Sequence, residues 1–307
     1  MTVQQQLGVG PPPPAAAGPR PGGGVRGSIR RAPLIWFFSL AFLMSWVAWV
    51  PYILSGNGQG VLDFTFPGGD TGGSQLLGVL PGAYLGPILS AFLVTIITEG
   101  RPGLRAWVGR MTAWRVSWRW WAGVIVAVPL VLVLTLYALG GRSPVMPSAM
   151  VLAAFLPGLL LQMLTTGIAE EPGWRDFAMP RLQSAYGPVV GTLILGPLWG
   201  VWHLPLFLTD WGGTVLWYTP FEFVATTIAF SFVMTWLFNH TRQSLLLAML
   251  LHTGVNNFFS IAYSDVFPTL GDSYAAHAFL VSSTVVAAVL LVATRGRLGL
   301  PRDRAVP

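Results

Sequence analysis

Two adjacent carboxylates, Glu170 and Glu171, interrupt an otherwise apolar part of this chain. Charged groups are costly inside a membrane, so carboxylates in such a position are by default candidates for function. Glu171 and Arg175 are four residues apart and share one helix face, on which they can pair. Glu170 then points about 100° away and is left free to do chemistry. The alternative is that these residues simply end a membrane helix among the lipid headgroups.

Two histidines and an asparagine in later apolar segments can meet Glu170. The turn predicted at Tyr186-Gly187-Pro188 makes position 203 the antiparallel counterpart of position 170. His203 and Glu170 should therefore lie level, about 25 Å of helix from the turn. His252 lies roughly 12 Å inside a further segment, and Asn256 shares its helix face. We expect these residues, contributed by three helices, to form one polar cluster in the inner half of the bilayer.

Three other ionisable residues in or near apolar segments are better explained without chemistry. His240 and His277 lie near segment ends, where a histidine is wetted at the membrane interface. Glu222 opens a segment, and a solvated carboxylate at a helix start is favoured by the helix dipole.

The composition excludes an ordinary soluble enzyme. Hydrophobic residues make up 53% of the 307 residues and charged residues only 9%, against about 25% charged in soluble domains. Cysteine is absent, which excludes disulfides and thiolate chemistry. All 17 basic residues are arginines, and they lie between apolar runs rather than on a basic face that could bind nucleic acid. We therefore predict an integral membrane protein that does not bind nucleic acid.

The predicted fold is an all-α polytopic bundle of eight transmembrane helices. A crossing needs about 20 apolar residues, and no alternating segments of the kind found in β-barrels occur. Runs free of Asp, Glu and Arg are long enough for one crossing each, at 32–62, 71–98, 120–141, 143–169, 182–209, 223–241, 243–264 and 273–294.

The arginines orient these crossings. With the N-terminus inside, every arginine except Arg142 falls in a cytoplasmic segment, and the outer loops carry aspartates instead. Since short cytoplasmic loops are enriched in basic residues, both termini are predicted to be cytoplasmic. We expect a disordered Pro/Gly-rich tail at 1–32, a membrane domain at 33–294 with its catalytic core at 150–262, and a basic tail at 295–307. The Arg- and Trp-rich segment 101–121 is expected to be an interfacial helix.

At three motifs the sequence resembles the CAAX-protease and bacteriocin-processing (CPBP, or Abi) family of intramembrane proteases. The family's EExxxR matches residues 170–175, its aromatic-xxx-His matches Trp199 to His203, and its HxxxN matches His252 to Asn256. The aromatic residue is Trp where Phe is commoner. Asp176 stands where Gly is usual and could compete with Glu171 for the arginine.

The resemblance implies hydrolysis of a peptide bond by water within the membrane. In that family's scheme Glu170 would be the general base and His203 would help to activate the water. His252 and Asn256 would stabilise the oxyanion, and the pair formed by Glu171 with the arginine would hold Glu170 in place. The implied substrates are membrane-associated proteins, cut near the cytoplasmic face, and the all-arginine usage favours a bacterial cytoplasmic membrane.

Three alternatives stay open from the sequence. Glu170, His203 and His252 could hold Zn²⁺, although no HExxH run is present and a metal-free mechanism uses the same groups. The cluster could be structural in a non-catalytic immunity or scaffold protein, or could serve a transporter, for which we find no inverted repeat. Spacings such as Gly187-xxx-Gly191 and Gly196-xxx-Gly200 allow close helix packing within one chain or between two, so the oligomeric state is left open.

Overall fold

The computed structural model describes residues 24–68 and 73–300, and within these ranges every regular element is helical. The bounds of the α-helices are α1 Val25–Arg31, α2 Pro33–Leu54, α3 Gly73–Ala83, α4 Leu89–Thr98, α5 Gly100–Met111, α6 Trp118–Gly140, α7 Ala149–Gln162, α8 Ile168–Glu171, α9 Met179–Trp202, α10 Thr219–His240, α11 Leu245–Asn257, α12 Tyr263–Val266 and α13 Ser273–Thr294. Shorter π-helical and 3₁₀ turns join several of them. The predicted all-α class is confirmed.

Seven stretches in the described part of the chain are long and apolar enough to cross a membrane, as in an integral membrane protein. One of them, Ala149–Leu208, is 60 residues long and contains most of two predicted crossings. Its backbone breaks at Gly187, whose φ of 78° is not helical. A Cβ atom on Gly191 would lie 3.0 Å from the backbone nitrogen of Gln183, a contact that requires the chain to fold back between them. The predicted turn lies at this break, while the count of eight crossings remains a prediction.

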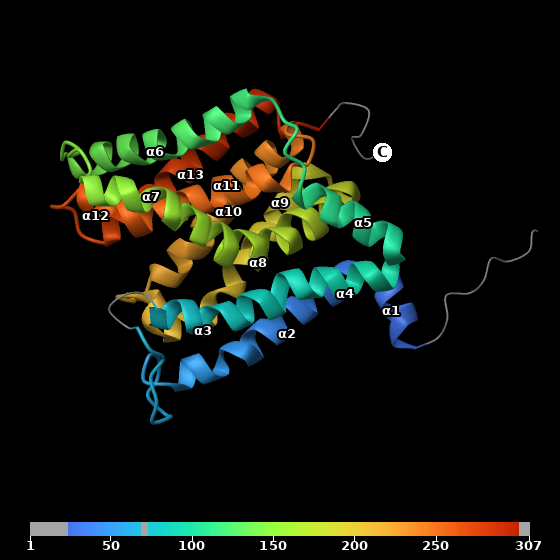
Figure 1. Cartoon of the computed structure of the whole chain (residues 1–307). Helices are drawn as coiled ribbons and strands as arrows, with labels where there is room; N and C mark the ends of the chain where they lie inside the picture. The colour runs from blue at the N-terminus through green and yellow to red at the C-terminus, as the bar shows by residue number, and fades with distance from the viewer. Residues whose placement is uncertain (1–23, 69–72, 301–307) are drawn as a thin grey trace, which may run out of the picture.

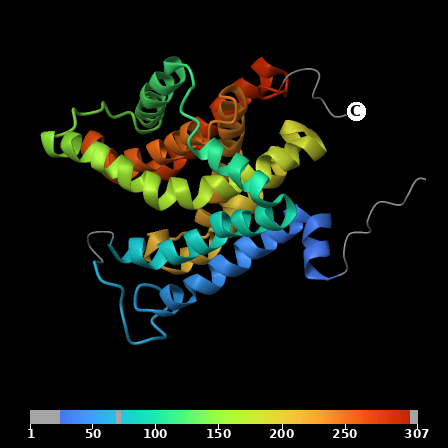
Figure 2. The same cartoon turned by 45° about the vertical axis from the view of Figure 1, so that its right-hand side comes forward.

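The helices form two groups with a central element between them (Figures 1 and 2). The first group is α2, α3 and α4, and the second contains α6, α7, α11 and α13. The stretch from α8 to α9 passes between the groups, and α10 packs against both α9 and α13. The site residues predicted from the sequence lie on α8, in the π-helical turn that follows it, at the C-terminal end of α9 and on α11, so they belong to the middle of the bundle.

Small residues on α3 allow it to pack closely against α2. Gly78 and Gly82 on α3 lie against the rings of Tyr52 and Trp49 on α2, where an added Cβ atom would overlap the ring. Such small-xxx-small stripes let membrane helices approach closely. Hydrogen bonds reinforce this contact, since the Trp49 indole donates to the carbonyl of Val79 at 2.8 Å.

Two of the glycines that the sequence left open between one chain and two, Gly196 and Gly200, pack within this chain. Gly196 lies against Ile228 and Gly200 against Val224, both on α10. A Cβ atom on Gly196 would come within 2.7 Å of the Ile228 backbone. These glycines therefore bring α9 and α10 of one molecule together.

The terminal predictions lie partly outside the described residues. Of the predicted tail at 1–32, residues 1–23 are not described, and Val25–Arg31 forms the helix α1. Of the predicted tail at 295–307, residues 301–307 are not described. The segment predicted as an interfacial helix contains α5, which carries arginines, and then the first turn of α6.

Candidate active site

The two adjacent glutamates lie on α8, a helix of only four residues between two π-helical turns, Met163–Gly167 and Pro172–Ala178. Pro172 follows Glu171 directly and has no N–H to donate, so the regular hydrogen-bond ladder is interrupted at this point. Local π-helical turns are a common adjustment around proline in membrane helices and are frequent at functional sites. The glutamates thus lie in a widened part of a helix at the centre of the bundle.

Glu171 is fully committed to two partners. Its Oε2 lies 3.3 Å from Nε of Arg175, one helical turn along, and its Oε1 accepts a hydrogen from Nδ1 of His252 at 2.8 Å. Glu171 and Arg175 both have no solvent exposure. The predicted pairing of Glu171 with Arg175 is present, and His252 from α11 adds a second partner that connects two helices.

The other glutamate, Glu170, keeps acceptor capacity. Its Oε2 accepts the indole hydrogen of Trp199 at 2.8 Å and lies 3.8 Å from Nε2 of His203. The last distance is too long for a direct hydrogen bond. A water molecule placed beside both groups can reach each of them. Glu170 and His203 are 6% and 7% exposed, so the pair predicted from the symmetry about the 186–188 turn does meet.

The surroundings of His203 fix its tautomer. Its Nδ1 lies 2.9 Å from the carbonyl oxygen of Trp199. Since a carbonyl only accepts, this nitrogen carries the hydrogen, and in the neutral ring Nε2 presents a lone pair towards Glu170. The rings of Trp211 and Phe223 pack on the imidazole, with centroids 5.7 Å and 5.0 Å away. His203 is therefore held as an acceptor with a defined ring plane.

His252 differs from His203 in the partner of its Nδ1 atom, which is a carboxylate and not a backbone carbonyl. Its Nδ1–H donates to the Glu171 carboxylate, so Nε2 is the ring nitrogen that this bond does not engage. Asn256 lies one turn further along α11 and is partly exposed. Within the described residues, Asn256 makes no hydrogen bond to the other site residues. His252 and Asn256 thus present an imidazole Nε2 and a side-chain amide on one helix face.

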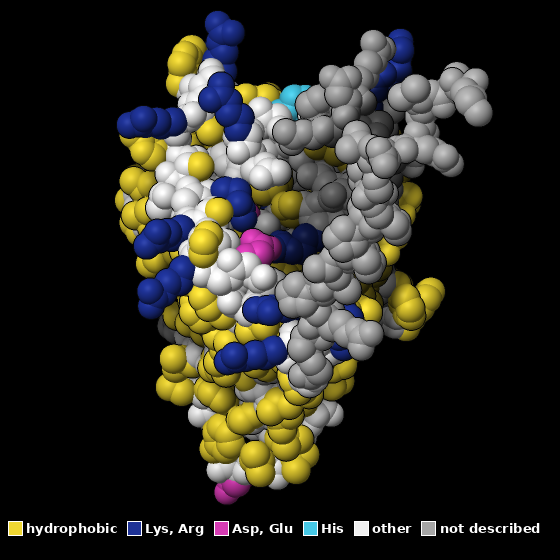
Figure 3. Space-filling view, turned by 90° about the vertical axis from the view of Figure 1, so that its right-hand side faces the viewer, with side chains coloured by type: hydrophobic (Ala, Val, Ile, Leu, Met, Phe, Trp, Pro, Cys, Tyr) yellow, Lys and Arg dark blue, Asp and Glu magenta, His cyan; other side chains and the backbone are white. Residues whose placement is uncertain are grey.

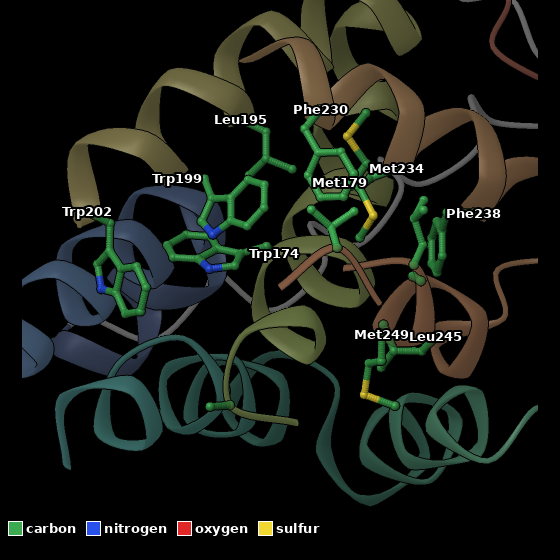
Figure 4. Close-up of a cluster of buried hydrophobic side chains, with 14 of the residues drawn as sticks. Trp174, Met179, Leu195, Trp199, Trp202, Phe230, Met234, Phe238, Leu245 and Met249 are labelled. Carbon is green, nitrogen blue, oxygen red and sulfur yellow. The ribbon is translucent and has the colours of Figure 1, made fainter. Parts of the chain in front are cut away.

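Trp199 connects all parts of the cluster, a role that sequence reasoning missed. Besides its bond to Glu170, its ring lies 4.5 Å from the guanidinium carbon of Arg175 and 5.1 Å from the ring of His252. Figure 4 shows Trp199 beside Trp174 and Trp202 among the buried side chains of this region. The spacing that places Trp199 on the face of His203 was visible in the sequence, but its contact with α8 depends on the packing of two helices.

Within the described residues, Asp176 does not compete with Glu171 for Arg175. Asp176 is fully buried and forms its ion pair with Arg110 of α5. Arg175 instead lies towards Glu171, and its Nη2 is 3.4 Å from Oγ of Ser231 on α10. Asp176 therefore connects α5 to the π-helical turn and leaves the pair that supports the site intact.

The donors of this cluster do not form a metal site. Within the described residues, no three His, Asp or Glu side chains lie close enough together to hold a metal ion. His203 Nε2 lies 3.8 Å from Glu170, and Nδ1 of His252 is bonded to Glu171, so the three groups named as zinc ligands from the sequence are not drawn together in one such group. The residues present therefore do not fit a zinc ion bound by Glu170, His203 and His252.

Comparison with known proteins confirms the resemblance found in the three motifs. Residues 152–258 match the family model of the type II CAAX prenyl endopeptidase Rce1-like proteins. A relative named CAAX prenyl protease 2, from Methanococcus maripaludis, is 30% identical over 108 residues. That match covers 33% of this chain and 39% of the relative, so the similarity spans about two fifths of the relative's length. The segment matched to the family contains every residue of the three motifs.

Proposed function

We propose that this chain is an intramembrane endopeptidase that hydrolyses membrane-associated protein substrates with a water molecule activated by Glu170. One observation carries the proposal: two adjacent glutamates have opposite environments. Both carboxylate oxygens of Glu171 have a partner, Arg175 or His252. Glu170 faces His203, and its Oε1 keeps the capacity to accept a hydrogen. An arrangement that served only packing would not need a second buried carboxylate without a cationic partner.

In the proposed reaction a water molecule lies beside Glu170 and His203. The lone pair on His203 Nε2 accepts one hydrogen of this water and orients it, while Glu170 takes the other proton as the oxygen attacks the scissile carbonyl. The Trp199 indole holds Oε2 of Glu170, so that Oε1 is the oxygen available to the proton. This step forms the new carbon–oxygen bond and leaves the negative charge on the former carbonyl oxygen.

The donors on α11 are suited to that oxyanion. Nε2–H of protonated His252 and the side-chain amide of Asn256 would hold it, and preorganised donors of this kind are usually the largest catalytic contribution. Glu171 balances the imidazolium charge through Nδ1. Collapse of the intermediate breaks the carbon–nitrogen bond, and the proton on Glu170 passes to the leaving amine, which restores the carboxylate.

We further propose eight crossings with both termini on the cytoplasmic side. Figure 3 shows arginine side chains gathered on the end face of the bundle that lies to the right in Figure 1. The helices α1 and α5 at that end carry exposed arginines, among them Arg30, Arg101 and Arg105. Basic residues favour the cytoplasmic side, so this end is assigned to it. We also propose that the core 150–262 lies in a bacterial cytoplasmic membrane, which the arginine-only composition favours.

The first test is hydrolysis by the purified chain in detergent, with and without a chelator. Substrates would be membrane-tethered peptides, including prenylated C-terminal peptides because the similar archaeal protein is named a CAAX prenyl protease. We expect cleavage, and the same rate after dialysis against EDTA, because no three ligands converge in the described part of the site. A rate that falls with EDTA and returns with Zn²⁺ would contradict the metal-free mechanism. Absence of cleavage on every substrate by a folded chain would contradict the function.

Replacing Trp199 with Phe tests the contact to the base. Phe keeps an aromatic ring but removes the donor that holds Oε2 of Glu170, and hydrogen bonds to charged groups contribute about 1.5–3 kcal/mol. The expected result is a fall in kcat of roughly 10- to 100-fold with KM little changed. Trp202→Phe is the matched control, because its indole donates to Ser45 instead of to a carboxylate. Equal rates for the Trp199 variant and the wild type would show that this bond does not position Glu170.

A further inference from the structure

A second ionisable pair lies outside the proposed catalytic cluster. Glu222 near the start of α10 accepts a hydrogen from Nδ1 of His277 on α13 at 2.5 Å. The Glu222 side chain is 11% exposed and that of His277 is 42% exposed. Glu222 has no arginine partner within the described residues. The carboxylate is thus largely buried, and its one ion-pair partner in the described part of the chain is His277. The sequence interpretation of a solvated carboxylate at a helix start does not fit this burial.

Glu222 lines a cavity of about 190 Å³ between the start of α10, α13 and the 3₁₀ turns after α9. The cavity wall also contains Phe207, Trp211, Phe223 and Phe279. Three of these rings stand nearly perpendicular to one another, at 88°, 73° and 78°, with centroids 5.4–5.7 Å apart. The faces of these rings therefore point in different directions around the cavity, whose wall also contains the Glu222 carboxylate. Aromatic faces and a negative charge together attract a cation.

The location of the cavity suits a cation at the membrane surface. The segment just before Glu222 exposes several large apolar side chains, with Trp217 at 83% and Phe221 at 72%. Tryptophan and other apolar side chains exposed at a helix end are typical of the membrane interface. Lipid headgroups occupy that interface.

The cavity also adjoins the proposed catalytic cluster. The Trp211 and Phe223 rings that form part of its wall are the rings that pack on His203, the former nearly parallel at 16°. A group bound in the cavity would therefore share two side chains with the imidazole that faces Glu170.

We propose that this cavity binds an organic cation, the ammonium group of a phosphatidylethanolamine headgroup, between the aromatic rings and the Glu222 carboxylate. The exposed Trp217 and Phe221 just before Glu222 favour a lipid as the occupant. Binding here does not require hydrolysis, so it can be measured in a chain that is catalytically inactive.

The test is saturation-transfer NMR of tetramethylammonium with the purified full chain in phosphatidylglycerol nanodiscs. We expect a saturable signal that is weakened about tenfold or more in Glu222→Gln, since this loss corresponds to roughly 1.4 kcal/mol. Glu170→Gln is the matched control and should bind as the wild type does, whether or not proteolysis occurs. Trp211→Leu is a second variant, to be used if Glu222→Gln is not folded. It should also weaken the signal. Equal signals from the wild type and the variants would overturn the proposal.

Two further arms identify the source of the cation. Adding phosphatidylethanolamine to the nanodiscs displaces tetramethylammonium if the occupant is a lipid headgroup. Adding a Lys-containing peptide displaces it if the occupant is a peptide side chain, and the same peptide with norleucine at that position should not. Displacement by phosphatidylethanolamine is the expected result. Displacement by the peptide alone, or by neither, would overturn the proposal.

Discussion

Replacing Glu170 with Gln is expected to slow substrate hydrolysis by about 10²- to 10⁴-fold, the range contributed by a positioned general base. Gln has nearly the same shape, and its amide oxygen can still accept the Trp199 indole hydrogen. The substitution therefore removes the ability to take a proton from water while the packing is kept. Cleavage rates of a tethered peptide by purified protein measure the effect, and thermal unfolding of the same samples shows that the variant is folded.

Glu99→Gln is the control for this change. It removes a carboxylate of the same type from the surface, where Glu99 is 47% exposed and pairs with Arg181. Its rate should equal that of the wild type. If Glu170→Gln also cleaves at the wild-type rate, Glu170 is not the base, and the non-catalytic interpretation of the cluster becomes the better one.

Much of the cluster could be predicted because helix geometry is local and regular. The spacing of Glu171 and Arg175 fixes a shared face, and the structure pairs them. The symmetry of positions 170 and 203 about the turn fixes their heights, and the structure places their side chains 3.8 Å apart. Both arguments need only the rise and the period of a helix and one turn signal.

Contacts that depend on how helices rotate against one another could not be predicted in this way. The sequence placed His252 at a suitable height but could not say which of the two glutamates it would face, and it faces Glu171. Likewise, the Asp176–Arg110 pair depends on where α5 docks. Helices that are apolar on all sides carry a weak periodicity signal, so side-chain packing alone sets their rotation.

Arg175→Met is expected to destabilise the fold by about 3–5 kcal/mol, the cost of removing one member of a buried ion pair. Both Arg175 and Glu171 are fully buried, and the substitution leaves the Glu171 carboxylate with His252 alone. It also removes the cation from the face of Trp199. Thermal unfolding in detergent should show a large decrease in Tm. The pair of Arg181 with Glu99 supplies the control, because Glu99→Gln at its 47% exposed member should cost about 0–1 kcal/mol.

The double variant Glu171→Gln/Arg175→Met separates the stability of this pair from its chemistry. Replacing both members removes the unpaired buried charge, so much of the lost stability should return, and a double-mutant cycle gives the coupling between the two residues. Hydrolysis by the double variant should nevertheless be impaired, even though the variant is folded. His252 then has no carboxylate to balance an imidazolium, and Nε2 no longer carries a proton for the oxyanion. Recovery of the cleavage rate together with Tm would mean that the pair serves only the fold. Single variants that are each mild and simply additive would mean that the pair is not coupled at all.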